Sequence, residues 1–334
     1  MSFKRLDPED FIISSDSITA TLWSGGTVAL TDFYTSSVQE AGSSGDFYLN
    51  IYQTASTDAS AAVQFAVTYG NALGSGSSYY NNAVPYVSPT MTTYGQYQNL
   101  ILGDENTDFV FGNITSSEFF AISVDRTRYK ETLFPGSLTL YLSGSGGLLS
   151  LTDNSQIVPT VTFNDAGRVF QIVSGAAGNV FTGVNSNGYS AASGSYGWLL
   201  PDIGTILLNP KAISASIQVD ANRTNNSDGL NYRIIYNAID LGGNFQLNSQ
   251  ETISSDYIFV RARNAEFNYS ENPSFISGST GEVIYNNFIN NPQTFPTTIG
   301  LYNDNNELLA VAKLSRPLLK DFTKEALVRV KLDF

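Results

Sequence analysis

The chain has 334 residues, of which 42% are hydrophobic and only 14% charged, and its formal net charge is −13. This length allows two domains or one elaborate all-β domain. Histidine and cysteine are both absent, which excludes Ser-His-Asp and Cys-His nucleophiles, zinc sites of the usual kind and a disulfide framework.

Charge is distributed unevenly along the chain. Between residues 6 and 125 there are 13 acidic and no basic residues, whereas the rest holds 17 of each. Such an acidic surface repels nucleic acid, because neutralising phosphate needs Lys and Arg. The segment 313–334 has the opposite bias, with six basic and three acidic residues. These two ends suit contacts between neighbouring chains; chance clustering on a soluble surface is the alternative.

Neither a secretion signal nor membrane insertion is expected. The first sixteen residues lack the apolar stretch of a signal peptide. No other run approaches the roughly 20 apolar residues of a membrane span.

Short runs that alternate apolar and polar residues predict half-buried antiparallel strands. Helical signals are few. The clearest is 88–103, with Ser88 as N-cap, Pro89 in the first turn and Gly103 as the stop, and shorter ones lie at 209–214 and 316–325. The sequence therefore predicts a mainly β fold of antiparallel, sandwich-like sheets with one or two short helices. The strand-like runs begin at Ser17, Asp46, Ala61, Phe119, Ser137, Thr160, Arg168, Thr205, Tyr257 and Ala326.

Composition divides the chain into three regions. Residues 1–150 form an acidic, mainly β N-terminal domain that ends at a hinge-like Gly/Ser run, 143–147. Residues 151–255 form a Gly/Ser/Asn-rich β region, in which 174–197 is expected to be an extended arm that is mobile in the free subunit and ordered against a neighbour. Residues 256–334 form a C-terminal β unit.

The C-terminal unit has the most regular apolar pattern. Two strand-like runs flank Asn303–Asn306 and predict a β-hairpin over 299–314. Both faces of its second strand are apolar up to Lys313, so we expect that strand to be covered on both sides. The closing strand 326–334 has one apolar and one charged face, as in a strand with one side at solvent or at a partner's acidic surface. We expect the charged face to dock on such a surface, which the acidic N-terminal third supplies. The candidate interface residues are Lys313, Arg316, Arg329 and Lys331.

No pattern predicts catalysis or a cofactor. Asp125 and Glu131 flank a basic cluster and could act as a glycosidase pair, but alternating charges in a predicted strand favour a solvated or interfacial face. The segment 220–231 spaces oxygen ligands as a calcium loop does, yet lacks the glycine and glutamate of an EF-hand. We therefore predict a protein that is not an enzyme, with no catalytic, cofactor-binding or metal-binding residue.

One resemblance rests on the C-terminal run "NNPQTFPTTIGLYNDNNELLAVAKLSRPLLK" together with 260–275, 326–334 and upstream runs at 33–53, 61–77, 94–104 and 128–144. These segments resemble virion structural proteins of T4-like tailed phages that infect marine cyanobacteria. The resemblance implies a structural subunit of the contractile tail, in the baseplate or its fibre attachments, made in the host cytoplasm.

The partners that this resemblance implies are other copies of the chain and other tail or baseplate proteins, without nucleic acid or membrane insertion. Three alternatives stay open. The chain could be a receptor- or glycan-binding tail module that contacts a host-surface glycan. It could be a tail-associated depolymerase, or a structural protein of the neck or capsid.

Overall fold

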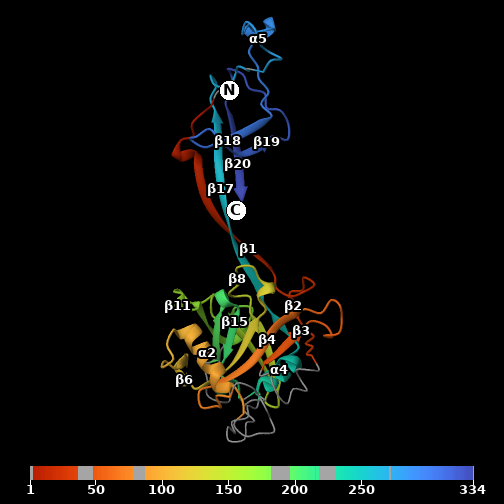
Figure 1. The fold of residues 1–334 in the computed structure, drawn as a ribbon, viewed down its shortest axis with the longest axis vertical. Coiled ribbons are helices and arrows are strands. Elements are labelled where there is room, and N and C mark those ends of the chain that lie inside the picture. Colours follow the sequence, from red (N-terminus) through yellow and green to blue (C-terminus); the bar gives the residue numbers. More distant parts are fainter. Residues whose placement is uncertain are drawn as a thin grey trace. The chain divides into compact units, whose positions relative to one another are not determined.

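The computed structural model describes residues 3–36, 48–77, 87–181, 196–214, 216–217, 231–270 and 272–333. The chain divides into two compact units (Figure 1). Residues 18–251 form one, which we call the large unit, and residues 1–17 with 252–334 form the other, which we call the C-terminal unit. The division falls within strands β1 (Phe11–Thr21) and β17 (Asn248–Ala262). The predicted boundary at 150 falls within a strand of the large unit.

Strand accounts for 42% and helix for 15% of the structure, which confirms the predicted mainly β class. Each of the predicted strand-like runs contains a strand. Among the described residues, the helices of the large unit are α2 (Thr90–Leu102), α3 (Pro210–Ile213) and α4 (Asn231–Gly242). Its strands are β2 (Ala29–Leu30), β3 (Tyr48–Tyr52), β4 (Val63–Asn71), β5 (Phe109–Phe111), β6 (Ile114–Ser116), β7 (Glu118–Val124), β8 (Thr132–Leu133), β9 (Thr139–Gly144), β10 (Gly147–Asp153), β11 (Thr162–Asn164), β12 (Gly167–Ala176), β13 (Asn179–Val180), β14 (Gly197–Leu200), β15 (Thr205–Leu208) and β16 (Phe245–Gln246).

One 12-stranded sheet organises the large unit, in the order β2-β16-β9-β10-β12-β14-β15-β7-β4-β3, with β11 and β13 paired to β12. Neighbouring strands along this path are antiparallel. The run 143–147, predicted to be a hinge, is instead the tight turn between β9 and β10, in which Gly144 pairs with Gly147. That prediction was wrong because a short Gly/Ser run serves a hairpin turn as well as a hinge.

The sheet is covered on both faces where β7 runs through it. Phe120 and Ile122 of β7 belong to the larger apolar core, whereas Phe119 and Ala121 belong to a second, aromatic core. All four side chains are fully buried. The near-continuous apolar sequence of β7 follows from this two-sided burial.

Helices α2 and α4 supply side chains to different cores. Tyr94 and Ile101 of α2 lie in the aromatic core, and α2 ends at Gly103, whose φ of 66° is left-handed. The predicted stop is thus confirmed, but the N-cap position is Pro89, not Ser88. Helix α4 was not predicted, although its buried Ile235 and Ile239 recur at helical spacing within the larger core.

Two further local predictions, a strand through residues 126–128 and a helical turn at 316–325, are wrong. Residues 126–128 form a 3-10 turn and not a strand, because the Asp125 carboxylate accepts the Thr127 main-chain N–H at 2.9 Å and caps the turn. The segment 316–325 contains bends and turns but no helix. Most of the predicted arm, 174–197, lies outside the described residues. The calcium-like loop at 220–231 also lies outside them, except for residue 231.

The C-terminal unit is built from β-ribbons (Figure 1). Strand β17 pairs with β1 and with β20 (Ala326–Asp333) in one sheet. Strands β18 (Thr298–Tyr302) and β19 (Leu308–Lys313) form a separate two-stranded hairpin, which confirms the predicted turn at 303–306. A five-residue helix, α5 (Asn286–Asn290), completes the unit.

Candidate interaction surface of the C-terminal unit

The C-terminal unit buries little apolar surface of its own. Both apolar cores lie entirely in the large unit. Among the described residues of the C-terminal unit, the buried hydrophobic side chains are Ile258 and Val330, cross-strand partners in the β17–β20 ladder. Large hydrophobic side chains that stay exposed in this unit are Phe3, Phe11, Ile12, Ile13, Tyr269, Ile284, Tyr285, Ile289, Phe295, Tyr302, Leu308, Leu309, Val311, Phe322 and Leu327.

The hairpin shows this exposure most clearly. Along β19, Ala310 and Ala312 are half-buried, whereas Leu309 and Val311 on the other face are 68% and 58% exposed. We expected both faces to be covered, and within this chain that expectation was wrong. The sequence pattern does mark apolar faces, but the described residues leave one of them exposed.

The exposed apolar side chains of the hairpin form a connected group. The Phe3 ring packs edge-on against Tyr302 at 5.0 Å between centroids. Tyr302 is the cross-strand partner of Leu308, and both side chains reach across Gly300, where any added Cβ would lie 2.8 Å from the Tyr302 ring. Val311 pairs with Gly300. We call this group, which consists of Phe3, Tyr302, Leu308, Leu309 and Val311, the hairpin patch.

Charges of opposite sign lie at the two ends of the hairpin. Lys313 pairs with Thr298 at the open end of the ladder. Asp304 and Glu307 lie in or beside the turn at the other end. Lys313, Asp304 and Glu307 are all exposed. Arg316, another predicted interface residue, is exposed in a bend that follows β19.

The other two predicted interface residues share one face of β20. The Arg329 guanidinium lies 5.6 Å and the Lys331 ammonium 5.8 Å from the centre of the Tyr257 ring on β17. Lys331 also pairs with Asp333 at 2.9 Å. The Asp333 carboxylate raises the pKa of Lys331, and a smaller contribution comes from Asp16 on β1. Part of this basic face is therefore already matched by acidic groups of the same unit.

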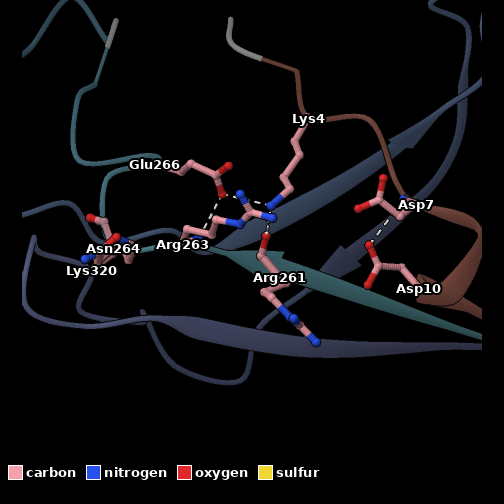
Figure 2. A network of polar contacts seen from close by, with 8 residues as sticks. All are labelled: Lys4, Asp7, Asp10, Arg261, Arg263, Asn264, Glu266 and Lys320. Carbon is pink, nitrogen blue, oxygen red and sulfur yellow. Dashed lines mark hydrogen bonds and ion pairs between the residues drawn. The ribbon is translucent and has the colours of Figure 1, made fainter.

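A polar network ties the N-terminal segment to the end of β17 (Figure 2). The Lys4 ammonium donates to the Arg261 carbonyl at 2.6 Å and to a Glu266 carboxylate oxygen at 2.9 Å. Glu266 also accepts the Arg263 main-chain N–H at 2.8 Å. These two hydrogen bonds, that from Lys4 first, lower the pKa of Glu266. The network fixes a loop that the small apolar core could not hold.

Lys320 is the second polar anchor, and its side chain is almost fully buried. Its ammonium donates to the carbonyls of Asn264 and Asp321 at 3.0 and 3.1 Å and to the Asn268 side-chain oxygen at 2.9 Å. All three N–H groups are thus satisfied, which a buried ammonium requires. The main chain of Lys320 pairs with Thr294 in an isolated bridge. Sequence patterns gave no sign of this anchor, because a lysine beside an aspartate is normally expected at the surface.

Two carboxylates with catalytic potential accept structural hydrogen bonds in the described part of the chain. The Asp125 carboxylate is used as a cap and also accepts the Thr127 hydroxyl at 2.5 Å. The buried Glu118 of the large unit accepts the Tyr69 hydroxyl at 2.5 Å, which is an ordinary way to satisfy a buried carboxylate. Across the described ranges, no group of three or more acidic side chains is arranged to hold a metal ion.

Comparisons with known proteins give no assignment. No family model matches the chain, and no match was found among curated proteins or among solved structures. None of the helices in the described part of the chain is long and apolar enough to cross a membrane.

Proposed function

We propose that the chain is a non-enzymatic structural subunit of a tailed-phage virion, located in the contractile-tail baseplate or its fibre attachment region. The observation that carries the structural part of this proposal is the exposed apolar surface of the C-terminal unit. The location in a phage tail comes from the sequence resemblance alone.

The physical argument concerns how a folded unit is stabilised. A unit of this size normally buries more than half of the surface that its unfolded chain exposes, and it does so around its own core. Here Ile258 and Val330 are the buried hydrophobic pair among the described residues of the unit. Subunits of permanent assemblies solve this problem with neighbouring chains, whose interfaces resemble a domain core cut in half. An assembly subunit therefore explains both the ribbons and the exposed side chains.

The test is the position of the chain in purified particles. A phage that encodes the chain should carry it in stoichiometric copies, and an antibody against the large unit should label the tail end of the particle in electron micrographs. Absence of the chain from purified virions contradicts the proposal. Labelling at the neck or capsid instead keeps the structural role and rejects the tail location.

A glycan-binding tail module is the second candidate. It is favoured by the exposed rings of Tyr269 and Tyr285, since tyrosine can stack on a sugar and hydrogen-bond to it. Tyr285 packs edge-on against Phe275, which in turn contacts Phe288, so the ring is held by neighbours. Binding of the isolated chain to host polysaccharide, lost in Tyr285→Ala, supports this function. No binding of the unchanged chain rejects it, and binding retained in Tyr285→Ala rejects this ring as the binding residue.

A further inference from the structure

We propose that the hairpin patch binds the same patch of a second copy of this chain, with the two hairpins packed antiparallel across a two-fold axis. The proposal rests on the assembly role above and names the partner and the surface for it. Three features of the C-terminal unit support it: the apolar area of the patch, the placement of charge at its ends and the shape of the hairpin face.

The combined apolar area of two hairpin patches is close to the apolar share of a standard-size specific interface. Phe3, Leu308, Leu309 and Val311 are more than half exposed and Tyr302 about a third. At roughly 100 Å² for each side chain, one patch offers about 500 Å² and two copies about 1,000 Å². A standard interface buries about 1,600 Å², of which about 65% is apolar in homodimers. Two hairpin patches therefore provide the apolar share of one such interface.

The charges favour a second copy over an unrelated partner. A two-fold axis places each end of one hairpin beside the opposite end of the other, so that every contact occurs twice. Lys313 of one copy then meets the turn that carries Asp304 and Glu307 of the second copy. Within one chain, the described residues supply no ion-pair partner for Lys313. The patch is thus complementary to itself.

The hairpin face can accept a facing sheet. Gly300 is the middle residue of β18, and the Tyr302 ring and a Leu308 methyl group lie across it, so the centre of this face is apolar. Side chains of two stacked sheets interdigitate in this way when the sheets lie about 10 Å apart. The register shift between Leu301 and Tyr302 leaves Leu309 without a cross-strand partner, and its side chain is exposed.

Charge reversal with mixing tests the arrangement directly. One variant is Lys313→Glu, and the other is Asp304→Lys with Glu307→Lys, each made in the full-length chain. Each variant alone faces two like-charge contacts, so its self-association should weaken about tenfold or more at low salt. In an equimolar mixture every contact again joins opposite charges. The mixture should therefore form heterodimers with an affinity near that of the unchanged protein, measured by sedimentation and native mass spectrometry.

Two control variants separate the patch from general effects of charge. Lys324→Glu makes the same charge change at an exposed turn outside the hairpin and should leave self-association unchanged. Leu309→Glu in the patch should give monomers, whereas Leu241→Glu, at an exposed position of α4 in the large unit, should not. Circular dichroism confirms that each variant is folded.

The outcomes are distinct. A dimer that is weakened in each reversed variant and restored in the mixture supports the proposal. Unchanged dimers in the reversed variants, or weakened ones that mixing fails to restore, overturn it, and so does a trimer or larger ring. A chain that stays monomeric at high concentration also overturns it, but leaves the virion role intact, since that role is tested in particles. In that case another tail protein covers the patch.

Discussion

Replacement of Lys320 by methionine probes how the C-terminal unit holds together with so small a core. The change keeps a long apolar stem and removes the ammonium with its three hydrogen bonds. Asn264 keeps a donor for its carbonyl, the Asn268 amide at 2.6 Å, and the Asp321 carbonyl keeps the Lys324 N–H. The Asn268 side-chain oxygen loses its donor, and a buried acceptor without a donor costs about 1–3 kcal/mol.

The expected loss is therefore about 1–3 kcal/mol for Lys320→Met, confined to the C-terminal unit. Hydrogen exchange followed by mass spectrometry measures the loss of local stability in peptides that cover 264–268 and 320–324. A local measurement is needed because the chain has two units, so a single global unfolding transition does not report on one of them. Lys324→Met is the matched control: its ammonium lies 3.8 Å from the Asp321 carboxylate at the surface, and it should change stability by less than about 0.5 kcal/mol.

A double-mutant cycle with Asn268→Ala sharpens the test. When both side chains are removed, the Asn268 acceptor and the Lys320 donor disappear together, and only the Asn264 carbonyl is left without a donor. The single variants each leave a polar group of this pair unsatisfied, so the double variant should lose less stability than the two single variants together. Additive losses, or a Lys320→Met variant as stable as the control, would show that the ammonium does not anchor this loop.

Three further changes have defined outcomes. The pKa of Glu266 lies below its ordinary 4.5, so the contribution of its pair with Lys4 is present above that pH and lost as pH falls through the lowered value. Protection of residues 3–10 against hydrogen exchange, relative to the intrinsic rate at each pH, should therefore fall below pH 4.5, and Lys4→Met should remove this pH dependence. Phe65→Ala should cost the large unit about 3–5 kcal/mol in urea unfolding, since its ring is fully buried, while the exposed Phe163→Ala should cost almost nothing; equal effects would contradict the placement of the core. Truncation before Ala326 removes β20 and should give aggregates in light scattering; a soluble truncated chain with an intact C-terminal unit would refute the role of β20.

Local patterns predicted the strands well, because alternation along a strand directly reflects which side faces the core. The hairpin at 298–313 and the charged face of β20 both follow from that period. Helix α4 was missed for a related reason. Its buried positions, Tyr232, Ile235 and Ile239, recur at helical spacing, but asparagine residues flank and interrupt them and suggest a loop.

The sequence could not reveal which protein chain buries an apolar face. Leu309 and Val311 look the same in sequence whether the chain, a second copy or another protein buries them. Among the described residues of the single chain, both side chains are exposed. Lys320 is the opposite case, since its burial depends on acceptors more than fifty residues away in the chain.

The most direct test of the account is a cryo-EM reconstruction of the intact virion that encodes this chain. The account predicts density for the chain in the baseplate region, with the hairpin patch and in particular Tyr302 and Val311 covered by another protein chain. A particle in which these side chains face solvent, or one that lacks the chain, would contradict it.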